Sequence, residues 1–219
     1  MPSSRKAMGA STIKKKVAAR KMSSTRKTST KTTTRKMSSN RGNTWIALLR
    51  GVNVGGHNIV RMEKLRSILS TSSKFGNVKT YIQSGNVVFE AAAPADENRL
   101  SSDLSTVLTR NFKVQPGVVV QVFSVAAMET VLKRNPFKGH SAVHLFFLSE
   151  SASGSDFKKL QALTANGEEV KLVGNTVYLL APNGIGKSKL VEKIDRVLSG
   201  SKTSRNLRTV TKILELCAD

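Results

Sequence analysis

Two short turns rich in glycine and asparagine carry the side chains best suited to bind a polar ligand. The first runs from Arg50 to Asn58, and its candidate ligand-binding residues are Arg50, Gly51, Asn53, Gly55 and Gly56. Arg50 and Asn53 supply side-chain donors, and the glycines leave backbone N–H groups accessible. A helix expected after this turn adds partial positive charge at its N-terminus, so the segment predicts an anion site. A loop that only turns sharply and packs closely is the alternative.

The second turn follows a strand, and its candidates are Tyr81, Gln83, Ser84 and Asn86. The spacing of Tyr81 and Gln83 predicts that both side chains share one face of the strand. Tyr81 is suited to stack on a base or to hydrogen-bond a ligand, and packing at a sheet edge is the alternative. No histidine or carboxylate stands in an arrangement that would activate Ser84 as a nucleophile, so we interpret it as a turn residue.

A third polar segment, Ala181–Ser188, is close to the phosphate-loop pattern G-x-x-x-x-G-K-[ST], with Ala181 in place of the first glycine. The candidates here are Gly184 and Lys187, and Lys189 directly after the segment. No later apolar strand ends in an aspartate that would hold magnesium, which argues against a nucleotide triphosphatase. An anion site at the start of the following helix is the remaining functional interpretation.

The last polar cluster precedes the C-terminal helix and contributes Arg205 and Asn206. Arg205 and Arg208 are three residues apart, a spacing that places both guanidinium groups on one side of a helical turn. Two such groups can clamp a phosphate or a carboxylate, or they can pair with acidic residues on the surface.

The charge of the chain is concentrated in its first 43 residues. This segment holds 13 Lys or Arg, 15 Ser or Thr and no Asp or Glu, and it has too few apolar residues to offset the entropy of ordering, so it predicts a disordered basic tail. The rest of the chain has 23 of the 36 basic and all 14 acidic residues, a net charge of +9. Such a tail is drawn to polyanions, and a solubilising arm is the alternative.

The location of the protein is predicted to be intracellular. The Lys-rich clusters favour nuclear delivery, and mitochondrial or cytoplasmic locations are the alternatives. No apolar run reaches the roughly 20 residues of a membrane span. The single cysteine, Cys217, excludes an internal disulfide, and three histidines without carboxylate neighbours predict no metal site. No cofactor is predicted, and the sequence does not fix an oligomeric state.

Hydrophobic periodicity predicts an α+β protein. From 44 to 124 the expected order is β-α-β-β-α-β, a ferredoxin-like domain. Its expected elements are strand 45–49, helix 62–74, strands 78–83 and 87–90, helix 96–112 and, after Gly117, strand 118–123. From 125 to 219 we expect a second, smaller and degenerate α+β domain. Its expected elements are helix 124–134, strand 144–148, helix 156–163, strands 170–173 and 177–180, and helices 187–198 and 206–216.

The motifs LLRGVNVGG, TYIQSGNVVFE, NPF, NGIGKSKL and SRNLRTV together resemble domain-of-unknown-function family 1697 (DUF1697) from Thr44 to Leu216. The resemblance implies a pair of ferredoxin-like domains and assigns no reaction. It marks these motif positions: Arg50, Gly51, Asn53, Gly55, Gly56, Gln83, Ser84, Gly85, Asn86, Gly184, Lys189, Arg205, Asn206 and Thr209. Leu207 stands where the family often has Trp, and Ser204 where it often has Thr.

Three functional hypotheses follow. The first is an anion-binding module whose Gly/Asn loops and Arg/Lys residues receive a phosphorylated small molecule or a nucleic acid, with the tail adding nonspecific affinity. The second is a small metal-independent enzyme acting on a polar or phosphorylated metabolite. An enzyme would gather Arg50, Gln83, Lys189 and Arg205 in one concave pocket, whereas nucleic-acid binding would spread them over a basic face. The third is a protein-interaction domain.

Overall fold

The computed structural model describes residues 43–115 and 118–219. The predicted tail, except Asn43, and Gly117 lie outside the described residues. The described elements are β1 (Thr44–Arg50), α1 (Met62–Ser70), β2 (Phe75–Tyr81), β3 (Asn86–Ala91), α2 (Glu97–Asn111), β4 (Val119–Ser124), α3 (Val125–Lys133), β5 (Val143–Leu148), α4 (Gly154–Gln161), β6 (Glu169–Val173), β7 (Thr176–Leu180), α5 (Lys189–Val197), β8 (Lys202–Asn206) and α6 (Leu207–Ala218).

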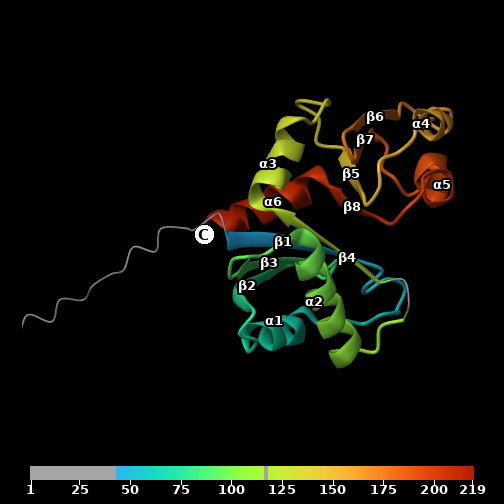
Figure 1. Cartoon of the computed structure of the whole chain (residues 1–219). Helices are drawn as coiled ribbons and strands as arrows, with labels where there is room; N and C mark the ends of the chain where they lie inside the picture. Colours follow the sequence, from blue (N-terminus) through green and yellow to red (C-terminus); the bar gives the residue numbers. More distant parts are fainter. Residues whose placement is uncertain (1–42, 116–117) are drawn as a thin grey trace, which may run out of the picture. The chain divides into compact units, whose positions relative to one another are not determined.

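The described strands form two four-stranded antiparallel sheets of the same order (Figure 1). The first sheet runs β2-β3-β1-β4 and the second β6-β7-β5-β8. The sequence predicted an incomplete second half, and this was wrong, because β8 pairs with β5 and completes the sheet. The residues of β8, Lys202–Asn206, include no apolar side chain, so hydrophobic alternation did not predict a strand here. The α+β class predicted from the sequence is confirmed.

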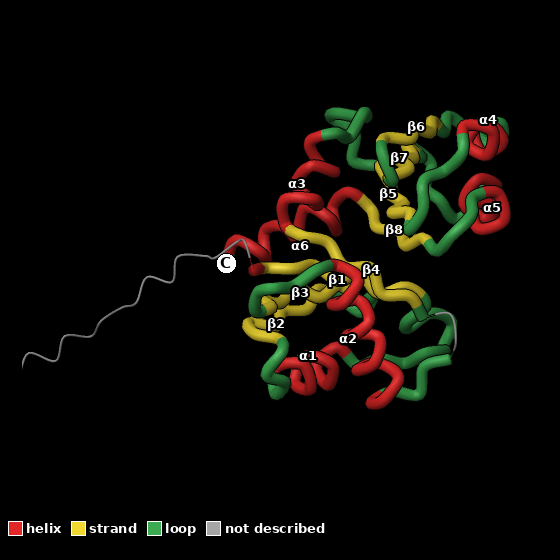
Figure 2. Tube along the Cα trace, in the orientation of Figure 1, coloured by secondary structure: helices red, strands yellow, loops and turns green. Residues whose placement is uncertain are grey.

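Each sheet is apolar on both faces. In β1, Ala47 and Leu49 join the core under α1 and α2, whereas Ile46 and Leu48 face a second core that also contains residues of β5, α3 and α6. The opposite face of the second sheet packs against α4 and α5. Figure 2 shows α1 and α2 on one side of the first sheet and α3 and α6 on the other. Because both faces of β1 are buried, successive residues of the strand are all apolar, and the sequence shows a continuous apolar run.

The boundary between α1 and β2 differs from the prediction. α1 ends at Ser70 and not at Lys74, and β2 begins at Phe75 and not at Val78. Phe75 is buried and packs edge-on against Phe89, with 5.3 Å between ring centroids. A register shift between Gly76 and Lys79 interrupts the pleat. Such a bulge breaks the alternation of side chains between the two faces of the strand. For this reason the hydrophobic periodicity of the sequence did not predict the first residues of β2.

In the part of the chain that the structure describes, no helix has the length and apolar character needed to cross a membrane.

One pH effect on stability follows from His144 in β5. Burial lowers the pKa of its imidazole below the ordinary 6.5. The unfolded chain therefore binds a proton more readily, and stability is lost as the pH falls through the unfolded pKa. We expect His144→Gln to reduce the loss of unfolding free energy between pH 7.5 and pH 5, measured by urea denaturation. His140→Gln, at an exposed position, is the control. Equal losses in wild type and His144→Gln would contradict this assignment.

Candidate functional site

The first predicted turn is a closed loop held by two asparagines. Asn53 donates through Nδ2 to the carbonyl oxygens of Val60 (2.9 Å) and Gln83 (2.8 Å), and its Oδ1 accepts from the Val60 amide. Asn58 donates to the Gly51 carbonyl at 2.8 Å and accepts from the Gln115 amide at 2.7 Å. The amide group of Asn53 is thus used inside the protein, where it fixes the loop and ties it to the second turn.

The second predicted turn joins β2 to β3 as a hairpin. β2 ends at Tyr81, opposite Asn86, and Ile82 has a φ of +48°. Gln83 therefore lies in the turn, and the prediction that it shares a strand face with Tyr81 is wrong. The reason is the left-handed backbone at Ile82, which ends the strand at Tyr81, two residues before the predicted end. Tyr81 is half-buried against the core between the sheets.

The hydroxyl group of Ser84 lies in the same hairpin. Ser84 Oγ accepts from Asn86 Nδ2 at 3.0 Å, and in the described part of the chain no acid or histidine is hydrogen-bonded to it. Asn86 Nδ2 also donates to the Tyr81 carbonyl at 2.9 Å. The geometry therefore uses both side chains to close the turn, as expected for a serine without a base.

Arg205 joins the end of β1 and the second turn to the second sheet. Its Nε donates to Asn86 Oδ1, and its Nη2 donates to the carbonyl oxygens of Leu49 (2.8 Å), Ser84 (2.9 Å) and Gly85 (3.1 Å). Nη1 donates within β8. Burial lowers the pKa of Arg205 to about 10. Its donors are thus occupied by protein acceptors, which makes Arg205 a structural link between the two sheets.

Four charged residues and one serine around this link form what we call the motif cluster: Arg50, Ser84, Asp195, Lys202 and Arg205. They line a hollow of about 280 Å³. Asp195 pairs with Arg50 at 2.5 Å and with Lys202 at 3.3 Å, so two of the three cations already have a carboxylate partner. Arg50 and Arg205 converge here as an enzyme would require, but Gln83 and Lys189 are not among the lining residues.

Two predictions about the last polar cluster need correction. Arg205 lies in β8 and Arg208 in α6, so they do not share a helical turn. Arg208 lines a different hollow, beside Tyr81. Asn206 is the N-cap of α6, accepting from the Thr209 amide at 2.8 Å. The missed strand β8 is the cause of both differences.

The segment like a phosphate loop stands apart from the other motifs. Gly184, Lys187 and Lys189 are exposed. Ser188 caps α5 by accepting from the Val191 amide at 3.2 Å. The loop is a turn that leads into a capped helix, and its lysines point to no described hollow.

A second hollow lies beside the first turn. We call it the basic hollow, and its basic lining residues are His57, Arg61, Lys64 and Lys113, with no Asp or Glu among the described residues that line it. Its volume is about 640 Å³. The Lys64 ammonium lies 5.3 Å from the centre of the Phe112 ring, which also lines the hollow.

The backbone brings the start of α1 to this hollow. Arg61 is the N-cap of α1 and makes no side-chain capping hydrogen bond. The free N–H groups of the first helical turn and the helix dipole therefore add partial positive charge near Arg61 and Lys64. Of the residues predicted from the sequence, Gly56 lines this hollow.

Sequence reasoning missed Arg61, Lys64 and Lys113 as site residues. Lys113 follows α2, some 50 positions after Arg61, and nothing in the local sequence links the two. A usable signal was the absence of a capping Ser, Thr, Asp or Asn before α1, since that leaves the helix start open.

Comparison with known proteins supports the fold. The model of a family described as protein of unknown function (DUF1697) matches residues 43–178. A solved structure, described as that of a conserved bacterial protein from Streptococcus pneumoniae, is similar with a TM-score of 0.61 and 23% sequence identity, covering 80% of this chain and 98% of that one. At this identity the likeness concerns the fold alone. No curated protein matches the chain.

Proposed function

Because the chain belongs to the DUF1697 family of proteins of unknown function, we propose a function from its own residues: it binds phosphate-bearing ligands at the basic hollow. The observation that carries this proposal is the lining of the hollow, where Arg61, Lys64, Lys113 and His57 stand without a carboxylate among the described lining residues. In the motif cluster, by contrast, Arg50 and Lys202 both pair with the carboxylate of Asp195.

The chemistry of the hollow suits a phosphate group. Arg61 offers a planar guanidinium that can bind two phosphate oxygens, and Lys64 and Lys113 add mobile ammonium groups. The start of α1 contributes N–H groups at the same place. Phe112 provides one aromatic surface near Lys64, on which a base of a nucleotide could stack. The +13 charge of residues 1 to 43 would add affinity that does not depend on sequence.

We also propose the finer architecture expected from the sequence. Each sheet, with the two helices that connect its strands, is a ferredoxin-like unit, because each has β-α-β-β-α-β order and an antiparallel strand order of 2-3-1-4. The first unit is residues 44–124, and the second lies within residues 125–219.

The proposal is tested by binding of a labelled oligothymidylate to the full chain across a salt series. We expect the triple variant Arg61→Gln, Lys64→Gln, Lys113→Gln to weaken binding on the order of tenfold or more. It should also reduce the slope of log affinity against log salt by about 2, since each lost contact with single-stranded nucleic acid removes about 0.7.

The control is a second triple variant, Lys158→Gln, Lys171→Gln, Lys193→Gln. These lysines are exposed and lie outside the basic hollow, and the change in net charge is the same. Equal losses in the two triple variants would refute the proposal. Titration with pyrophosphate, monitored by amide NMR shifts, distinguishes a small phosphorylated ligand from a nucleic acid. If pyrophosphate shifts the amides of residues 56–64 but the first triple variant binds oligothymidylate as well as wild type, the hollow would be assigned to small phosphorylated ligands.

A further inference from the structure

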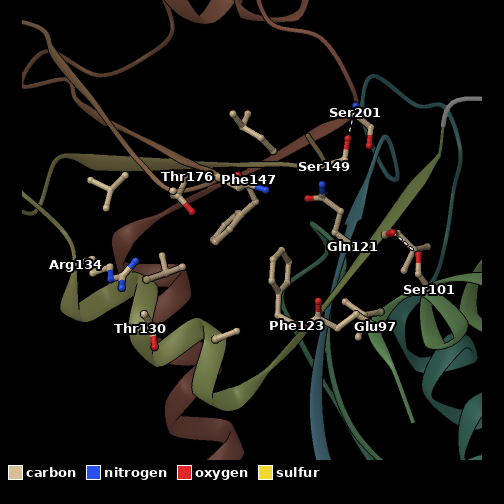
Figure 3. Close-up of a pocket in the computed structure, with 18 of the residues that line it drawn as sticks. Glu97, Ser101, Gln121, Phe123, Thr130, Arg134, Phe147, Ser149, Thr176 and Ser201 are labelled. Atoms are coloured by element: carbon tan, nitrogen blue, oxygen red, sulfur yellow. Dashed lines mark hydrogen bonds between the residues drawn. The ribbon is translucent and has the colours of Figure 1, made fainter. Parts of the chain in front are cut away.

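A groove with mixed polar and apolar lining lies between the two sheets, away from the basic hollow. Its volume is about 520 Å³, which is within the range of small-ligand sites. The lining comes from the start of α2, from β4, from α3, from the end of β5 and from the turn between β6 and β7. Figure 3 shows this groove.

An aromatic pair forms the centre of the groove. The rings of Phe123 and Phe147 are 5.1 Å apart between centroids and are tilted by 52°. Phe147 is almost fully buried, and Phe123 is partly exposed. The pair offers an apolar surface against which a flat group can pack.

Most polar groups of the lining are already satisfied. Ser101 Oγ donates to the Val120 carbonyl at 2.6 Å, and Thr130 Oγ1 donates to the Ala126 carbonyl at 2.8 Å. Ser149 Oγ accepts from the Ser201 amide at 2.9 Å. These groups therefore shape the groove and leave little capacity for a ligand.

Gln121 also lines the groove. Its Oε1 is buried and has no hydrogen-bond partner among the described residues. The side chain projects into the groove near Phe123 and Ser149 (Figure 3). A buried acceptor without a partner is destabilising, so a leucine of similar size would be favoured here on stability grounds alone.

Two charged side chains stand at opposite ends of the groove. Arg134 lies at one end and Glu97 at the other, with the two phenylalanine rings between them (Figure 3). The Arg134 side chain makes no hydrogen bond or ion pair with the residues that the structure describes. Glu97 Oε1 accepts only a long contact, 3.4 Å, from the Ser124 amide. One charge of each sign disfavours a dianionic phosphate and favours a zwitterion.

We propose that this groove binds a small zwitterionic amide that carries an aromatic ring, the chemistry of an aromatic dipeptide. The ligand's carboxylate pairs with Arg134, its ammonium group with Glu97 and its amide N–H with Gln121 Oε1, while its ring packs on Phe123 and Phe147. The site is separate from the basic hollow and shares no lining residue with it.

The test uses the full ¹⁵N-labelled chain and glycyl-phenylalanine as probe. Three analogues each remove one group: N-acetylglycyl-phenylalanine lacks the ammonium, glycyl-phenylalanine amide the carboxylate and glycyl-alanine the ring. We expect shifts in β4 and in the turn at Gly174 and Asn175 with the probe, and about tenfold weaker binding for each analogue.

Two variants separate binding from folding. Gln121→Leu should raise the melting temperature, because it removes the unpaired acceptor, and weaken probe binding at least about fivefold. Wild type should bind glycyl-phenylalanine more tightly than glycyl-phenylalanine amide, and Arg134→Gln should abolish this preference. The proposal is overturned if millimolar probe leaves the β4 shifts unchanged, if Gln121→Leu binds as well as wild type, or if Gln121→Leu lowers the melting temperature.

Discussion

Replacing Arg205 by methionine is expected to lower the free energy of unfolding by about 3–5 kcal/mol. The side chain is 8% exposed, and its donors satisfy Asn86 Oδ1 and the carbonyl oxygens of Leu49, Ser84 and Gly85. Methionine fills similar volume but leaves Asn86 Oδ1 and the carbonyl oxygens of Leu49 and Ser84 without this donor, at about 1–3 kcal/mol for each one that stays dry, whereas the Gly85 carbonyl keeps its bond from the Leu49 amide. Urea denaturation at neutral pH measures the loss, which is a large share of the stability of an ordinary domain.

Two further variants test the reason for this loss. Arg205→Lys keeps the charge but cannot reproduce the planar fork, so we expect it to recover only part of the stability. Arg208→Met, three residues later on exposed helix surface, is the matched control and should change stability by less than about 0.5 kcal/mol. If Arg205→Met proved no worse than Arg208→Met, Arg205 would not be the link between the sheets.

Gly85→Ala is the second change with a large expected effect, about 3–5 kcal/mol of unfolding free energy. A Cβ at Gly85 would lie 2.6 Å from Leu49 Cβ and 2.8 Å from Val52 Cγ2, which are buried core atoms. The φ of +80° adds the cost of a left-handed conformation. Because Gly85 also bonds the Leu49 amide through its carbonyl, the hairpin cannot move away freely.

Gly184→Ala provides the comparison that separates the two costs. Its φ is +77°, nearly the same as that of Gly85, but nothing lies within 4 Å of an added Cβ. We expect this variant to lose only about 1–2 kcal/mol, the backbone term alone. Thermal or urea unfolding of both variants gives the steric contribution as the difference. Similar losses at the two positions would show that the contact with Leu49 is relieved cheaply.

Most of the fold was predictable because its elements carry local signals. The continuous apolar run of β1, the helical spacing in α2 and the Gly-Asn turn between β6 and β7 each predicted the element that the structure contains. The failures have local causes as well. β8 has no apolar alternation, and the irregular register of β2 disguised its first residues.

The candidate sites were less predictable, since each depends on residues far apart in the sequence. The sequence predicted the asparagines and arginines of the motifs as ligand-binding candidates. However, the structure uses Asn53 and Arg205 to hold backbone carbonyl groups of distant segments, and Asn86 to close its own hairpin. A residue type and a spacing cannot distinguish a donor that meets a ligand from one that meets the protein itself.

The sequence by itself determined the α+β class, nearly all the elements and the family, because hydrophobic periodicity and turn chemistry act over a few residues. Only the tertiary structure decided that Arg205 is buried in a strand, that Lys113 and Arg61 line the same hollow, and that Gln121 Oε1 has no partner among the described residues. Burial and partner choice arise from contacts across more than fifty residues of chain, and no local pattern encodes them.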